Sequence, residues 1–340
     1  MTALPSPLPL MQLATGFWSF KTLAAAHELD VFGRLSGTNG VTVEEFATQW
    51  GLAQRPADAL LTGLASLGLL DKKDGRYVNS ELSETYLVPG SANDFSGLVT
   101  MFDRRLYAGW DELVRALKTN KPTTWDPDVD ATLYDAADPA IMSLFWGAMH
   151  SMSRLTARSL GEAVDLSRFR SLLDIGGGSG AFDIELCKQY PSLRANVYDM
   201  KFVTEIAARN IEQEQLSDRI GVTGGDFFVD ETYPAGSDLH LYSMIMHDWV
   251  PEKNKALLRK SFDALPSGGM VVICELVIDD DKTGPPAAAL MSLNKLVETE
   301  GMNYTASEYF DWLGGIGFTG LEVVPFESPG ANAAVLARKP

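Results

Sequence analysis

One stretch constrains the fold more than any other. In LLDIGGGSGAFDIELCKQYP, residues 172–191, an apolar segment leads into a glycine-rich turn and then into a helical pattern. Glycines in a turn between a strand and a helix bring bare backbone close to a ligand or allow a positive φ. The turn lacks the dinucleotide spacing G-x-G-x-x-G, because position 181 is Ala, and it lacks the Gly-Lys-Ser/Thr of a P-loop. The glycines therefore indicate a ligand loop without specifying a pyrophosphate.

The chain from Ser171 onward alternates apolar strand patterns with helical ones. The expected strands cover residues 171–176, 194–200, 219–227, 238–246, 269–277, 319–326 and 333–339. Helical patterns lie between most of them, which predicts a Rossmann-like α/β fold with a doubly wound, mostly parallel, seven-stranded sheet. We assign it to residues 101–340, with a helical linker over 101–165.

Residues 1–100 predict a separate, mainly helical domain. Thr42 and Glu45 have the spacing of a capping box, and Asp74-Gly75 marks a hairpin turn, so helix, turn, helix and hairpin follow in a winged-helix-like order. Six Lys and Arg residues against ten Asp and Glu in this segment, and a net charge of −17 overall, argue against nucleic acid. The alternative is a dimerisation domain, and Phe17, Trp18 and Phe20 widen its first apolar face enough to favour a homodimer.

Targeting signals are not apparent in the sequence. Residues 1–20 carry no charged side chain, but they lack a basic segment and are interrupted by three prolines and a glycine, so they read poorly as a signal peptide or a membrane span. The two cysteines lie in apolar patterns typical of buried free thiols. We expect a soluble, cytoplasmic protein without a membrane partner.

Acidic residues after the next two strands refine the ligand. Asp199 follows Gly178 by twenty-one residues and could bind both ribose hydroxyls, while Asp226 and Phe227 could bind and stack on an adenine. The carboxyl ends of parallel strands meet at one sheet edge, so these groups would lie together. Alternatively, both acids could cap the following helices. Two such acids beside a glycine loop favour an adenosine site.

These segments, together with GGDFF, HDW and ALPSGGMVVICELV, resemble the class I S-adenosylmethionine-dependent O-methyltransferases, in particular the caffeate and acetylserotonin O-methyltransferase family with its bacterial natural-product relatives. The resemblance covers nearly the whole chain and implies S-adenosylmethionine as cofactor, S-adenosylhomocysteine as product and no metal. It implies these cofactor-binding residues: Ser153, Asp174, Gly176, Gly178, Asp199, Met200, Asp226, Phe227 and Ser243. Ser243 stands where the family often has Lys.

Methyl transfer to a hydroxyl requires alignment and removal of a proton. His247 follows the fourth strand beside the predicted cofactor site and is the candidate general base. The resemblance assigns Glu275, twenty-eight residues later, as the carboxylate that orients the imidazole. Where the family has a second Glu, this chain has Asn303, and Glu298 or Glu300 could substitute for it. Asp248 could contact the cofactor, cap a helix or line the substrate pocket.

An apolar pocket for an aromatic acceptor is the last predicted feature. Its candidate lining, which could equally be ordinary core, is Phe145, Trp146, Met149, Met246, Asp248, Met291 and Met302. The predicted activity is therefore O-methylation of a small aromatic in secondary metabolism. Two alternatives remain: C- or N-methylation on the same scaffold, and a non-catalytic winged-helix regulator that senses S-adenosylmethionine.

Overall fold

The computed structural model describes residues 4–91, 93–129 and 139–340. The chain divides into two compact units after Tyr107, later than the expected boundary at residue 100. Each unit has its own elements and its own core, so each is described separately.

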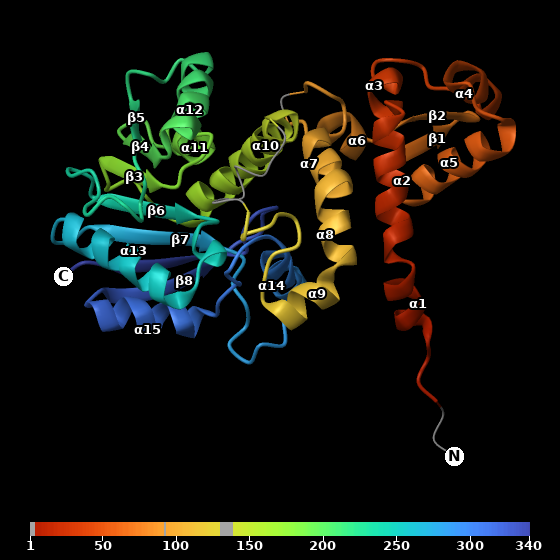
Figure 1. The fold of residues 1–340 in the computed structure, drawn as a ribbon. Helices are drawn as coiled ribbons and strands as arrows, with labels where there is room; N and C mark the ends of the chain where they lie inside the picture. Colours follow the sequence, from red (N-terminus) through yellow and green to blue (C-terminus); the bar gives the residue numbers. More distant parts are fainter. Residues whose placement is uncertain (1–3, 92, 130–138) are drawn as a thin grey trace. The chain divides into compact units, whose positions relative to one another are not determined.

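The N-terminal unit is mainly helical and contains one two-stranded hairpin (Figure 1). Its elements are α1 (Leu8–Ala14), α2 (Gly16–Glu28), α3 (Val31–Leu35), α4 (Val43–Trp50), α5 (Gln54–Ser66), β1 (Leu70–Lys73), β2 (Arg76–Asn79), α6 (Glu81–Tyr86), α7 (Ser96–Met101) and the π-helical turn η1 (Phe102–Leu106).

Local sequence signals define two of these elements. The hydroxyl of Thr42 accepts a hydrogen bond from the Glu45 amide at 3.2 Å, and the Glu45 carboxylate accepts one from the Thr42 amide at 2.8 Å. The predicted capping box at the start of α4 is therefore confirmed. Asp74 and Gly75, at φ 50° and 80°, form the hairpin turn, as two residues at positive φ match the twist of the paired strands.

The C-terminal unit contains a seven-stranded sheet and most of the longer helices. The elements from the division onward are α8 (Tyr107–Asp111), α9 (Leu113–Thr119), α10 (Pro139–Ala163), β3 (Ser171–Ile175), α11 (Ala181–Gln189), β4 (Arg194–Asp199), α12 (Lys201–Gln213), β5 (Ile220–Gly224), β6 (Leu239–Ser243), the 3-10 turn η2 (Met246–Asp248), α13 (Pro251–Ala264), β7 (Met270–Glu275), α14 (Pro286–Glu298), α15 (Ala306–Ile316), β8 (Thr319–Pro325) and β9 (Ala333–Arg338).

The sheet has the strand order β5-β4-β3-β6-β7-β9-β8, seen in the green-to-blue part of Figure 1. The strands from β5 to β7 are parallel, and β9 runs antiparallel to both β7 and β8. The predicted doubly wound sheet is therefore confirmed. Strand order reverses between β3 and β6, and a crevice outside the carboxyl ends of the strands forms at such a reversal.

Side-chain alternation along the strands builds a core on each face of the sheet. Leu172 of β3 packs with residues of α10, α11 and α12, whereas the adjacent Leu173 packs with residues of α13 and α15. Because both faces are covered, the strands are apolar on both sides. The polar side chains that follow β3, β4, β6 and β7 therefore collect at the carboxyl edge.

Within residues 4–91, 93–129 and 139–340, no helix is long and apolar enough to cross a membrane.

Replacing Thr42 by Ala tests the cap of α4. The substitution removes the side-chain acceptor of the Glu45 amide and should lower the free energy of unfolding by about 1 kcal/mol. Urea denaturation measures it, with Thr42→Ser, which keeps the hydroxyl, as the matched control. Equal stability of the two variants would show that the hydroxyl does not stabilise the helix.

Candidate active site

The glycine-rich loop joins β3 to α11. Gly176 and Gly178 have φ values of 72° and 56°, which side chains disfavour. A Cβ on Gly176 would lie 2.4 Å from Cδ1 of Ile245, and one on Gly178 would lie 3.3 Å from the ring of Trp146. The positive φ values therefore favour glycine at both positions, and the loop presents backbone rather than side chains.

Asp199 ties this loop to the end of β4. One of its carboxylate oxygens accepts a hydrogen bond from the Gly178 amide at 2.9 Å, and the other accepts one from the Met200 amide at 2.7 Å. Helix α12 begins after Met200 without a side-chain cap, so the alternative of a helix-capping Asp199 is wrong. Burial raises the pKa of Asp199 to about 6, despite these two amide donors.

Two further carboxyl groups lie behind the loop. Asp174 in β3 and Asp183 in α11 are completely buried and lie against each other, so that their carboxyl groups can share a proton in a hydrogen bond. Burial, and then the charge of Asp183, raise the pKa of Asp174, and burial raises that of Asp183 to about 7. A Cβ on Gly177 would lie 2.7 Å from Asp174, so that acid lies directly beneath the loop. Burial disfavours the ionised form of these carboxyl groups, and a cationic ligand nearby would favour it.

The segment after β5 supplies the residues predicted for the adenine. Asp226 is exposed and accepts a hydrogen bond from the Phe228 amide at 2.7 Å, which closes a local turn. The ring of Phe227 packs edge-on against Trp249, with centroids 6.1 Å apart. The ammonium group of Lys260 donates to the Phe227 carbonyl at 2.8 Å and so fixes the segment.

A polar contact that the sequence analysis missed holds the loop from α10. Nδ1 of His150 lies 2.8 Å from the Ser179 hydroxyl, and the Asn210 amide donates to the Ser179 carbonyl at 3.0 Å. Burial, followed by the charge of Arg154, lowers the pKa of His150 to about 4, so the ring is neutral at pH 7. The predicted Ser153 lies nearly one turn further along α10, and Ser243 ends β6; both are partly exposed.

His247 lies in η2, directly after β6, with its side chain 2% exposed. Its Nδ1 is 3.0 Å from Oε2 of Glu275, although the two groups are not aligned as a hydrogen bond. The His247 amide donates to Oε1 of the same carboxylate at 3.4 Å. Its Nε2 is 4.0 Å from Asp248, beyond hydrogen-bond distance. The predicted pair of imidazole and carboxylate is therefore brought together.

A lysine absent from the sequence analysis completes this cluster. Nζ of Lys295 in α14 lies 2.9 Å from Oδ1 of Asp248. The preceding residue, Asn294, donates to the Glu298 carboxylate at 2.8 Å and accepts a hydrogen bond from the indole of Trp110 at 2.9 Å. The sequence offers one signal for the role of Lys295: the helical spacing of α14 places it close to Asn294 and Glu298.

Asn303, at the position of the family's second Glu, is buried close to the end of β7. Its side-chain amide donates to the Leu276 carbonyl at 2.6 Å, and its Oδ1 has no partner among the described residues. Its backbone amide donates to the Ser292 hydroxyl at 3.0 Å. Glu300, one candidate substitute, instead forms an exposed ion pair with Lys253 at 2.5 Å.

The predicted apolar lining is distributed over α10, α14 and the segment after α14. The rings of Phe145 and Trp146 pack edge-on at 5.2 Å, and Trp146 lies against the glycine loop. Met149 is partly buried, and Met302 is 40% exposed. Met291 packs against a small apolar cluster.

Met246 differs from the other predicted lining residues. It is completely buried in the core formed by β3, β6, β7, α13 and α15. Because it directly precedes His247, its burial anchors η2 but leaves no surface for a ligand.

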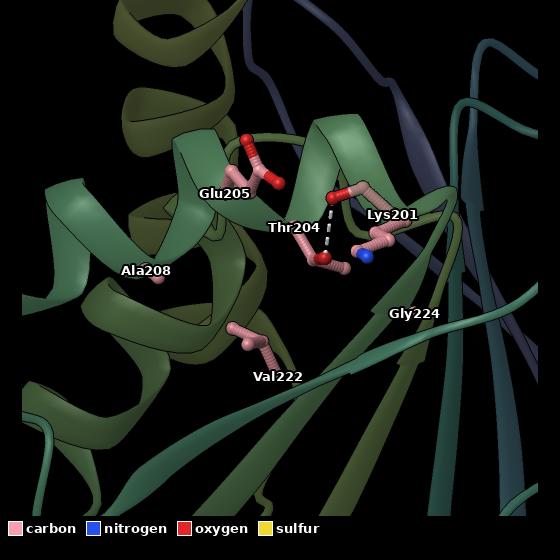
Figure 2. Close-up of a pocket in the computed structure, with 6 residues that line it drawn as sticks. All are labelled: Lys201, Thr204, Glu205, Ala208, Val222 and Gly224. Carbon is pink, nitrogen blue, oxygen red and sulfur yellow. Dashed lines mark hydrogen bonds between the residues drawn. The ribbon is translucent and has the colours of Figure 1, made fainter.

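A separate hollow of about 410 Å³ opens between α12 and β5, the edge strand (Figure 2). Its lining is Lys201, Thr204, Glu205, Ala208, Val222 and Gly224. The labelled Thr204 hydroxyl donates to the Lys201 carbonyl at 2.8 Å, within the helix. None of the residues predicted for cofactor or catalysis lines this hollow.

The described part of the chain contains no group of three His, Cys, Asp or Glu side chains placed to hold a metal ion.

Comparisons with known proteins agree with this architecture. The O-methyltransferase domain matches residues 110–319, and the O-methyltransferase dimerisation domain matches residues 11–89. The chain is 44% identical over 333 residues to 3-hydroxy-5-methyl-1-naphthoate 3-O-methyltransferase of Streptomyces sahachiroi, covering 98% of this chain and 95% of that protein. It is 32% identical over 347 residues to L-tyrosine C(3)-methyltransferase of Streptomyces lavendulae, covering 98% and 94%.

A solved structure has the same fold over the whole chain. Human N-acetylserotonin methyltransferase in complex with SAM superposes with a TM-score of 0.87 at 29% identity, covering 100% of this chain and 99% of that one. The fold and the glycine loop thus define a class I methyltransferase. The chain belongs to the O-methyltransferase family in which this domain follows a dimerisation domain.

Replacing Asp199 by Asn separates binding from stability. Because the pKa of Asp199 is raised to about 6 in the fold, the folded state holds a proton that the unfolded chain releases near pH 4. Wild-type stability therefore falls as pH rises from about 4 to 6. Asn cannot ionise, so the variant does not lose this stability. At pH 8 its free energy of unfolding should exceed that of the wild type by about 1–2 kcal/mol, a figure that allows for one lost hydrogen bond. At pH 4 the variant should show no gain over the wild type.

Urea denaturation at the two pH values measures this difference, with the exposed Asp311→Asn as control. In the same variant, calorimetry should show weaker binding of S-adenosylhomocysteine. Unchanged affinity would place the ribose away from Asp199, and equal gains at both pH values would contradict the raised pKa.

Proposed function

We propose that this O-methyltransferase transfers a methyl group from S-adenosylmethionine to a hydroxyl of a small aromatic acceptor, with His247 as general base. The observation that carries the proposal is the buried contact of His247 with Glu275 at the carboxyl edge of the sheet. This contact joins η2, which follows β6, to the end of β7, and β6 neighbours β3 where the strand order reverses.

The residues around the glycine loop fit the cofactor. S-adenosylmethionine, when bound, supplies an electrophilic methyl group on a sulfonium centre. Asp199 would bind the ribose, Asp226 and Phe227 the adenine, and Gly176 and Gly178 would admit the ligand next to backbone. The pKa values of the buried acids behind the loop are raised, and a ligand that carries positive charge would stabilise their ionised forms.

His247 has the arrangement of an oriented base. The carboxylate of Glu275 beside Nδ1 favours the tautomer with the proton on Nδ1, which leaves Nε2 to accept the proton of the acceptor hydroxyl. The same carboxylate stabilises the imidazolium that forms. A phenol has a pKa near ~10, so removal of its proton makes the oxygen a much better nucleophile at pH 7.

Acceptor chemistry is suggested by the relatives. The 44% identical protein carries a hydroxynaphthoate in its name, and the chain covers nearly all of it. A fused aromatic acid or phenol from secondary metabolism is therefore our first candidate acceptor. C-methylation of an aromatic ring is the second, because the tyrosine C(3)-methyltransferase also matches over nearly the whole chain. The His247–Glu275 contact favours an acceptor with an acidic proton over a sensor without catalysis.

Removal of the imidazole tests the base. His247→Ala should lower turnover by about 10²–10⁴-fold, with little change in affinity for S-adenosylhomocysteine. A phenol that is already ionised at pH 7 should recover more activity in the variant than an unactivated phenol. Transfer of labelled methyl to a panel of hydroxynaphthoates, phenols and tyrosine measures this, and the position of the methyl separates O- from C-transfer. Near-normal turnover with every phenol would overturn the assignment.

We further propose that the protein is a homodimer through its N-terminal unit. The match to the dimerisation domain supports this, as does an exposed apolar stripe on α1 and α2. The side chains of Leu13, Phe17 and Trp18 are 79%, 54% and 61% exposed in the single chain. Apolar patches of this kind on a soluble protein mark interaction surfaces.

Charge placed on this stripe should separate the subunits. Sedimentation of the wild type should give twice the 37.0 kDa chain mass, and Phe17→Asp/Trp18→Asp should give the single mass. Leu82→Asp, at a 52% exposed position on α6, is the matched control and should remain dimeric. A dimeric double variant would show that the stripe is not the interface.

A further inference from the structure

Lys295 is a buried cation in the cluster around His247. Its side chain is 12% exposed, and its Nζ lies 2.9 Å from Oδ1 of Asp248. That same oxygen lies 4.0 Å from Nε2 of His247. Asp248 is therefore bound to the lysine and not to the imidazole, although it directly follows His247 in the chain.

The charges around Lys295 are predominantly negative. Burial lowers the pKa of Lys295, but the carboxylates of Asp248, Glu298 and Glu275 outweigh burial and raise it above its ordinary value. The lysine is consequently charged at any working pH. It is a positive charge that offsets Asp248 and Glu275, the two carboxylates that lie within 4.0 Å of the His247 ring.

We propose that Lys295 is a positioning residue for the base: by binding Asp248 and offsetting the neighbouring carboxylates, it keeps Nε2 of His247 unprotonated and free to accept a proton. This inference rests on the proposed role of His247. Without the ammonium group, Asp248 could turn toward Nε2, and the uncompensated carboxylates would favour the imidazolium, which cannot act as a base.

The protonation of His247 also depends on the charged and titratable groups of the elements around it. They are Asp248 in η2, Glu275 and Cys274 in β7, Lys295 and Glu298 in α14, Glu252 and Lys253 in α13, Glu300 in the segment after α14, and Tyr304 and Tyr309 before and in α15. Burial raises the pKa of Cys274 and of both tyrosines, so these three stay neutral at pH 7. Lys253 and Glu300 are paired with each other, which leaves Lys295 as the cation that offsets Asp248 and Glu275.

Lys295→Met should therefore move the protonation midpoint of His247 upward by about one pH unit, the size expected for loss of a unit charge several ångströms away. The chain has four histidines, which makes selective ¹⁵N-histidine labelling and NMR titration of the resting protein direct. His150 and His240, with pKa values lowered to about 4 and 3 by burial, titrate outside this window. The acid side of the turnover profile should move with the NMR midpoint.

Two variants separate charge from packing. Lys295→Arg keeps the charge and should keep the wild-type midpoint. Lys295→Met/Asp248→Asn removes both partners of the pair, leaves no unpaired carboxylate at position 248, and should return the midpoint toward the wild-type value. Lys282→Met, in an exposed ion pair with Glu308, is the control for loss of any lysine and should leave the midpoint unchanged.

An unmoved His247 midpoint in folded Lys295→Met, or an equal shift in Lys295→Arg, would overturn the inference. Failure of the proposed base has a different signature, because His247→Ala would then keep normal turnover whatever the NMR midpoints are.

Discussion

A group of buried carboxyl groups at the carboxyl edge of the sheet is the constraint on which the rest of the site depends. Asp174 and Asp199 end adjacent strands, and Asp183 lies in the first turn of the following helix. Burial raises the pKa of all three. Two backbone amides donate to Asp199, whereas Asp174 and Asp183 lie against each other. The raised pKa values mean that the fold disfavours the ionised form of each acid, and a cationic ligand beside them would favour that form.

The second charged cluster, on β6, β7 and α14, is balanced differently. Glu275 faces Nδ1 of His247, and Lys295 holds Asp248 beyond hydrogen-bond distance of Nε2. The carboxylate of Glu275 thus orients the imidazole, while the carboxylate of Asp248 is bound by Lys295. The two clusters lie at the ends of neighbouring strands, so the same sheet geometry that gathers the acids around the loop sets a proton acceptor beside them.

The sequence predicted what depends on local pattern. All seven strands, the capping box at Thr42 and the hairpin turn at Asp74 follow from periodicity and turn chemistry, and the structure has them. The contacts of His150 with Ser179 and of Lys295 with Asp248 join residues 29 and 47 positions apart, and nothing local marks either pair. Met246 was predicted to line the substrate pocket but lies in the core, because a methionine pattern does not reveal which side of η2 faces the core.

A crystal structure of the protein with S-adenosylhomocysteine and a hydroxynaphthoate tests the central claim most directly. We expect the ribose hydroxyls on Asp199 and the acceptor oxygen about 2.6–3.2 Å from Nε2 of His247, with Lys295 still bound to Asp248. A cofactor bound away from the glycine loop, or an acceptor that presents a carbon atom to the methyl site with no hydroxyl near Nε2, would contradict it.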